Sequence, residues 1–139
     1  MRRIIIDNKY NDKKYELMFV FLSSFTGLSV DRLEERLKNF VEGRGIFLND
    51  VGVVFSNDPS ENIPGVPREF EELENFEGVG IYCDWYEEES PVLLTYQEFF
   101  ENLLPYVNVI MNDEPQAEKD RINEWMIKNI ERYNVLINQ

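Results

Sequence analysis

The chain has 139 residues, of which 43% are hydrophobic and 14% aromatic, so it can bury a core and lacks the composition of a disordered protein. It carries 14 basic and 27 acidic side chains, a formal net charge of −13, and no histidine. Such an acidic chain lacks the positive surface that binds nucleic acid or anionic membranes. The absence of histidine excludes Ser-His-Asp and Cys-His catalysis and ordinary zinc sites.

Cysteine content and hydropathy point to a single cytoplasmic domain covering residues 1–139. Cys83 is the only cysteine, so no disulfide forms within the chain, and its apolar surroundings predict a buried packing residue. The three isoleucines that follow Arg3 are too few for a signal peptide, which needs ~7–15 apolar residues at this point. The longest apolar run, residues 17–22, is far shorter than the ~20 residues that span a bilayer.

The N-terminal third is predicted to form a short strand and two helices. Residues 3–6 are β-branched and favour a strand. Residues 15–25 are strongly apolar, which predicts a buried helix. Ser29 has the features of an N-cap, and apolar side chains then recur at helical spacing from Val30 to Val41, until glycines end the pattern. We expect these two helices to pack as a hairpin.

The middle of the chain is predicted to be β-rich. Apolar residues alternate at 51, 53 and 55, and a clear period of two runs from 79 to 86. This second pattern places Trp85 on the same buried face as Val79 and Ile81, so we expect it to be a core residue more than an interface residue. The opposite face carries the better interface candidates, Tyr82, Asp84 and Tyr86.

The C-terminal third is predicted to be helical. Thr95 and Glu98 fit a capping box, and a broad apolar face follows as far as Ile110, with Pro105 expected to kink or split the helix. A last helix opens near Pro115 and carries an apolar stripe. The order of helices, strands and helices predicts an α+β fold, a small and mostly antiparallel sheet flanked by an N-terminal and a C-terminal helix pair.

Most of the negative charge is confined to one acidic window. Between Asp58 and Glu89 the chain has 11 acidic side chains and one arginine, which is −10 of the total −13. A charge run is usually only a solvated face, but this one adjoins large aromatic residues, the typical anchors of tight interfaces. Negative potential also accelerates association with a basic partner. We therefore predict a surface for a basic protein at Asp58, Glu69, Glu71, Glu72, Tyr82, Asp84, Tyr86, Glu87, Glu88 and Glu89.

The sequence offers little for catalysis, and we predict no catalytic, cofactor-binding or metal-binding residue. Gly78 and Gly80 lack the third glycine of a dinucleotide fingerprint and stand inside a strand pattern. The densest carboxylates, residues 87–89, are adjacent on one strand and point to opposite faces, so they do not converge. Three further interpretations remain open: an acidic mimic of nucleic acid that targets a DNA-binding protein, a carboxylate-dependent enzyme, and a scaffold or adaptor domain.

A succession of short motifs indicates a family. Gly43-Arg44-Gly45-Ile46-Phe47 leads into residues 50–55, Phe76-Glu77-Gly78-Val79 follows, and residues 94–100 and a Pro115-led acidic helix complete the series. In order and spacing, over about residues 40–135, this resembles the immunity proteins of bacterial contact-dependent growth inhibition systems that neutralise ribonuclease toxins. Such proteins often have a bulkier residue at the position of Gly80, and Asn-Pro where this chain has Glu114-Pro115.

The resemblance implies a non-catalytic role in the cytoplasm. Members of the family bind the C-terminal nuclease domain of a toxin, and the resemblance implies a one-to-one complex that occludes the active site. No nucleic acid, membrane or cofactor is implied as a partner. The resemblance transfers no contact residues, so the predicted surface rests on charge and aromatic side chains alone.

Overall fold

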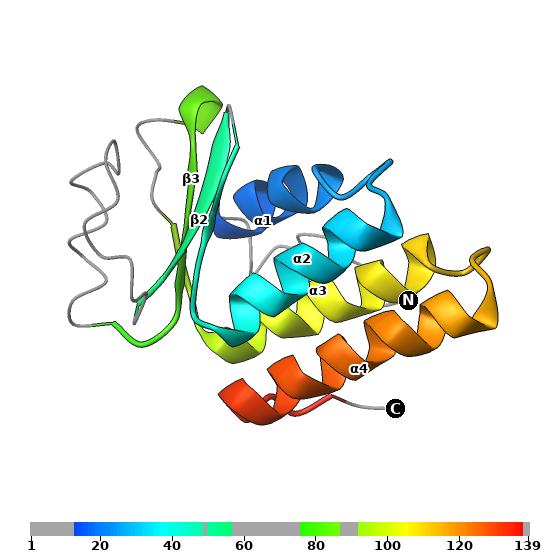
Figure 1. Ribbon diagram of the computed structural model, residues 1–139. Helices are drawn as coiled ribbons and strands as arrows, with labels where there is room; N and C mark the ends of the chain where they lie inside the picture. Colours follow the sequence, from blue (N-terminus) through cyan, green and yellow to red (C-terminus); the bar gives the residue numbers. More distant parts are fainter. Residues whose placement is uncertain (1–12, 49, 57–75, 87–91, 138–139) are drawn as a thin grey trace.

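The computed structural model describes residues 13–48, 50–56, 76–86 and 92–137 of the chain. The elements in chain order are α1 (Lys13–Ser23), α2 (Val30–Val41), β1 (Ile46–Phe47), β2 (Val51–Phe55), β3 (Val79–Cys83), the 3-10 turn η3 (Asp84–Tyr86), β4 (Val92–Leu94), α3 (Tyr96–Ile110) and α4 (Gln116–Tyr133). The strands form one antiparallel sheet in the order β1-β2-β3-β4, and the helices flank it (Figure 1). The predicted α+β class is confirmed. The strand predicted at residues 3–6 lies outside the described residues.

The register of the sheet follows the apolar alternation of its strands. Val53 of β2 lies opposite Ile81 of β3, which lies opposite Val92 of β4. Val53 and Ile81 are fully buried, and residues opposite each other in a sheet share a face. These residues therefore form the face that packs against the helices, while Gly52 and Tyr82 stand on the other face.

All four helices lie on one side of the sheet in Figure 1. α1 contacts β2, β3 and β4 directly, and α3 contacts β4, while α2 packs most extensively against α4. The sequence predicted a hairpin of α1 and α2 instead. The two helices do touch, since the rings of Phe21 of α1 and Phe40 of α2 lie 6.4 Å apart between centroids, and Arg36 of α2 donates to the carbonyl of Ser24 just after α1. The firmer contact is with α4, whose Asn129 and Tyr133 donate to the carbonyls of Leu37 and Phe40.

The helix ends confirm the capping predictions. The Ser29 hydroxyl accepts from the backbone N–H of Arg32 at 3.2 Å. Thr95 and Glu98 form the complete capping box, with bonds of 3.0 and 2.9 Å. The prediction that Pro105 could split this helix is wrong, since α3 runs as one helix past Pro105, with buried apolar side chains on both sides of it. In the described part of the chain, no helix combines the length and apolar character needed to cross a membrane.

The core is an aromatic cluster at the end of the sheet where β2 finishes. Phe55 of β2 lies 5.3 Å from Phe40 of α2, 5.8 Å from Phe99 of α3 and 5.6 Å from Tyr133 of α4, between ring centroids. Cys83, at the other end of β3, is buried as predicted. The cluster fixes one end of the sheet against the helices and leaves the opposite end, where β3 turns into η3, to carry exposed side chains.

Candidate functional site

Trp85 is an exposed residue at the end of the sheet. Its relative exposure is 68%, so the prediction that it joins the buried face of β3 is wrong. The strand stops at Cys83, and residues 84–86 form a 3-10 turn. Because such a turn has about three residues per revolution, the alternation of the strand no longer decides where side chains point. Figure 1 shows this turn beyond the labelled end of β3.

The register of the sheet places Asp50 beside Asp84. Val51 lies opposite Cys83, and the backbone N–H of Asp84 donates to the carbonyl of Asp50 at 2.9 Å. Both aspartates are exposed. Neither carboxylate makes a hydrogen bond or an ion pair with any residue that the structure describes. Sequence reasoning missed Asp50, although pairing the two alternating segments in an antiparallel hairpin would have indicated it.

An aromatic row continues from this point across the face of the sheet that is turned away from the helices. Phe47 lies opposite Gly52, which lies opposite Tyr82. A Cβ atom on Gly52 would stand 3.0 Å from the ring of Phe47, so the absence of a side chain there lets the ring lie close to the strand. Phe47 is 42% exposed and Tyr82 is half-buried. We call Phe47, Asp50, Tyr82, Asp84 and Trp85 the sheet tip.

The structure places only part of the predicted surface. Tyr82 and Asp84 lie together on the sheet tip, and Tyr86 ends η3. The remaining predicted residues lie outside the described ranges: Asp58, Glu69, Glu71, Glu72, Glu87, Glu88 and Glu89. The tip therefore adds Phe47, Asp50 and Trp85 to the two predicted residues whose side chains are described.

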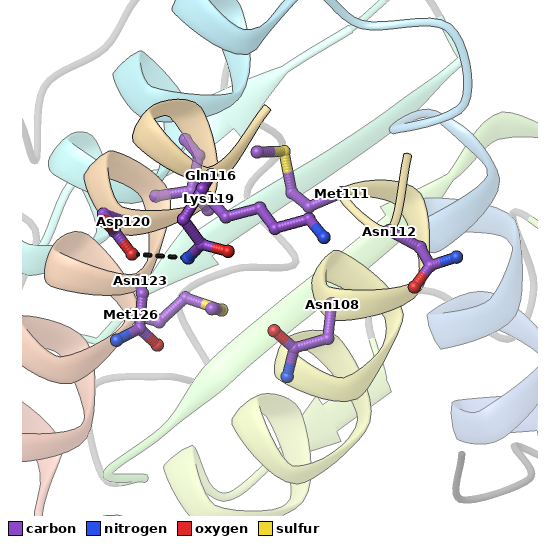
Figure 2. A pocket seen from close by; sticks show the side chains of 9 residues that line it. Asn108, Met111, Asn112, Gln116, Lys119, Asp120, Asn123 and Met126 are labelled. Carbon is purple, nitrogen blue, oxygen red and sulfur yellow. Dashed lines mark hydrogen bonds between the residues drawn. The ribbon is translucent and has the colours of Figure 1, made fainter. Parts of the chain in front are cut away.

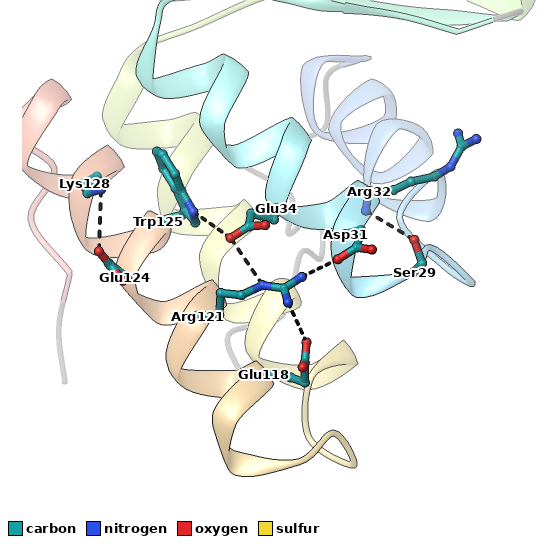
Figure 3. A network of polar contacts seen from close by, with 9 residues as sticks. All are labelled: Ser29, Asp31, Arg32, Glu34, Glu118, Arg121, Glu124, Trp125 and Lys128. Atoms are coloured by element: carbon teal, nitrogen blue, oxygen red, sulfur yellow. Dashed lines mark hydrogen bonds and ion pairs between the residues drawn. The ribbon is translucent and has the colours of Figure 1, made fainter.

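The carboxylates between α2 and α4 differ from those of the sheet tip because they bind an arginine. Arg121 of α4 binds Asp31 and Glu34 of α2, at 2.5 and 3.3 Å, and Glu118 of its own helix at 3.3 Å (Figure 3). The hydrogen bond with Asp31 raises the pKa of Arg121, and the charges of Glu118 and Glu34 add to this. The indole N–H of Trp125 donates to Glu34 at 3.0 Å. These acidic groups hold α2 against α4 and already have a cationic partner.

The chemistry of the sheet tip is that of a contact surface. It presents two carboxylates and large aromatic side chains, and no nucleophile with an adjacent base. Within the described ranges, no three side chains of the metal-binding types gather to hold an ion. Comparison with protein-family models, with curated proteins and with solved structures finds no match to this chain.

Proposed function

We propose that this chain is a non-catalytic inhibitor that binds and neutralises a toxin ribonuclease domain in the cytoplasm, by covering its basic active-site cleft. One observation carries the proposal: Trp85 stands 68% exposed beside Asp50 and Asp84, whose carboxylates have no described partner. Tryptophan is enriched among the residues that dominate binding energy at interfaces. An exposed tryptophan next to carboxylates that no described cation neutralises is the arrangement expected of a contact residue.

Charge complementarity supports a nuclease as that partner. An enzyme that cuts RNA has to hold phosphates, which requires a surface rich in lysine and arginine. The carboxylates of Asp50 and Asp84 can take the place of phosphates in such a cleft. The acidic window that follows in the sequence, with −10 of the −13 net charge, adds a field that steers a cationic protein toward this chain.

The resemblance to toxin immunity proteins agrees with this role and is part of the proposal. The segments that carry it fall on β1, β2, the start of β3, the N-terminus of α3 and the start of α4. These segments build the sheet and its junction with the helices. They therefore account for a shared scaffold, and the contact residues on that scaffold are specific to this chain.

The test is co-expression with the C-terminal domain of a large protein encoded directly upstream. We expect this domain to be toxic alone, to be tolerated in the presence of the chain, and to co-purify with it as a one-to-one complex whose ribonuclease activity is suppressed. A triple variant, Glu87→Lys with Glu88→Lys and Glu89→Lys, should slow association and abolish protection while the fold remains. Unchanged affinity would remove these three residues from the interface.

A second outcome distinguishes the acidic mimic of nucleic acid. If the captured partner is a DNA-binding protein, and duplex DNA displaces the chain from it without any toxin gene being present, then the toxin proposal fails. Growth that is unaffected by the upstream domain, with no complex formed, also contradicts it.

A further inference from the structure

The helical layer has a hollow between the end of α3 and the first half of α4, but its lining does not indicate a ligand (Figure 2). The carboxamides of Asn108, Asn112 and Asn123 are exposed there, so water satisfies them. Figure 2 also shows the charged ends of Lys119 and Asp120 directed apart. The edge of the sheet at β1 differs from this hollow, because the strand ladder fixes the direction of its main-chain hydrogen-bonding groups.

The ladder turns the N–H and the carbonyl of Phe47 away from β2. Leu48 donates to the carbonyl of Val51 at 2.9 Å, so these two residues form a hydrogen-bonded pair at the turn between β1 and β2. Bonded and non-bonded pairs alternate along an antiparallel ladder. Phe47 and Gly52, the next pair along, are therefore a non-bonded pair. The main-chain groups of Phe47 point to the outer side of β1.

The other side of β2 shows the same alternation. The backbone N–H of Asp84 donates to the carbonyl of Asp50, so Asp50 bonds toward β3. Gly52 lies two residues further along the same ladder and therefore also bonds toward β3. Its main-chain groups are directed away from Phe47, which agrees with the assignment made from the β1–β2 turn.

The outer side of β1 is open among the described elements. β1 is the outermost strand of the described sheet, and it packs most extensively against β2. Phe47 is 42% exposed, and outside the ladder its main chain makes no hydrogen bond with any residue that the structure describes. Open strand edges of this kind pair with an extended segment of another protein, which then adds a strand to the sheet.

We propose that an extended segment of the toxin nuclease domain pairs with β1 at Phe47 and adds a strand to the sheet beside the sheet tip. This inference rests on the proposed function, because charge selects the occupant of the edge. β1 leads into the turn that carries Asp50, next to Asp84, and both aspartates are exposed. A basic domain complements these carboxylates, whereas a second copy of this chain brings a further charge of −13.

The length of β1 sets the size of the contribution. The strand has only two residues, Ile46–Phe47, so the pairing supplies one donated and one accepted hydrogen bond at Phe47. These bonds fix the register of the partner segment, and Trp85 on the sheet tip supplies the larger share of the affinity. Loss of one such bond should weaken binding about tenfold.

The first test is hydrogen exchange of the unaltered chain, labelled with nitrogen-15, alone and saturated with the captured nuclease domain. In the free chain the amide of Phe47 should exchange faster than that of Val53, which the alternation pairs with Ile46 inside the ladder. In the complex the exchange of the Phe47 amide should slow at least about tenfold more than that of Val53. This measurement does not depend on any variant folding.

Variants separate the N–H of Phe47 from its ring. Phe47→Ala removes the ring alone, and Phe47→Pro removes the ring and the N–H. An edge strand tolerates proline where the N–H faces outward, so the two variants should have similar urea midpoints. Phe47→Pro should bind the nuclease domain about tenfold more weakly than Phe47→Ala. The matched control is Leu93 on β4, at the other edge of the sheet, where the proline and alanine variants should bind alike.

The outcomes distinguish this inference from the proposed function. If the nuclease domain is captured but the Phe47 amide is not slowed, or if Phe47→Pro binds as well as Phe47→Ala, the strand pairing is wrong and the proposed function stands. If no nuclease domain is captured, both are overturned. If the Phe47 amide of the free chain becomes protected as the concentration of the chain rises, the occupant is a second copy, and the inference is also overturned.

Discussion

Replacing Trp85 by alanine tests the sheet tip directly. A large aromatic side chain buries about 150–250 Å² when it is fully covered. Since Trp85 is 68% exposed, roughly 100–170 Å² remains for a partner to cover. At ~25 cal/mol per Å² this area corresponds to about 2.5–4 kcal/mol of binding free energy. Part of it is lost to ordering and imperfect packing, so we expect Trp85→Ala to raise the Kd at least about 30-fold, or about 2 kcal/mol.

The second tryptophan provides the matched control. Trp125 is half-buried between α2 and α4, donates its indole N–H to Glu34 at 3.0 Å, and has Lys128 at 4.2 Å over its ring. Trp125→Ala should therefore cost more folding free energy than Trp85→Ala, about 2–4 kcal/mol against at most about 1–2 kcal/mol. Because Trp125 lies in the helical layer, its loss should leave the Kd for the partner within about twofold.

The assay combines calorimetric titration of each variant with the captured nuclease domain and urea denaturation of each variant alone. We expect Trp85→Ala to lose more affinity for the partner than Trp125→Ala, and Trp125→Ala to lose more folding stability than Trp85→Ala. If Trp85→Ala binds as tightly as the unaltered chain, the tip is not the interface. If both variants lose affinity in proportion to their loss of stability, the reasoning from exposure is also refuted.

Further substitutions test the packing of the helices and of the sheet. Arg121→Met should lower the urea midpoint at low salt by leaving three carboxylates unneutralised, and this loss should shrink in 1 M salt, where the Debye length falls to ~3 Å. Asn129→Asp puts a charge at a fully buried position against two carbonyls and should cost about 3–5 kcal/mol of unfolding free energy. Asn129→Leu loses the bonds donated to Leu37 and Trp125 but also removes a buried oxygen without a described partner, and should cost less, about 1–2 kcal/mol. Gly45→Ala would place a Cβ 1.9 Å from the carbonyl oxygen of Val53 and should lower the free energy of unfolding by about 2–3 kcal/mol. Gly27→Ala should lower it by only about 1 kcal/mol, because the left-handed φ of +83° is the only obstacle there. Thermal unfolding of both variants measures the difference.

The features predicted correctly from the sequence are those encoded by neighbouring residues. Ser29 and the pair of Thr95 and Glu98 act on backbone groups within one turn, so their spacing alone identifies the helix starts. The alternation from Val79 to Cys83 likewise reflects a local geometric rule, and it is confirmed by the burial of every second side chain.

The features missed depend on contacts between distant segments. Trp85 continues the alternation in the sequence, but the strand ends before it, and the chain turns where Asp84 bonds to Asp50. That bond follows from the register of β2 against β3, which no short window of sequence specifies. The packing of α2 on α4 is equally non-local, since it is fixed by Asn129 and Tyr133 about ninety residues further along the chain.

Net charge alone does not determine where a basic partner would bind, because some acidic residues of this chain already form ion pairs. Arg121 holds the carboxylates between α2 and α4, and Lys128 lies 3.6 Å from Glu124. A cationic protein gains little by competing for such groups, since an existing ion pair would have to be broken. At Asp50 and Asp84 no described cation has to be displaced. Among the acidic residues that the structure describes, we therefore expect a basic partner to be drawn to the sheet tip, where an exposed aromatic side chain is available for a packed interface.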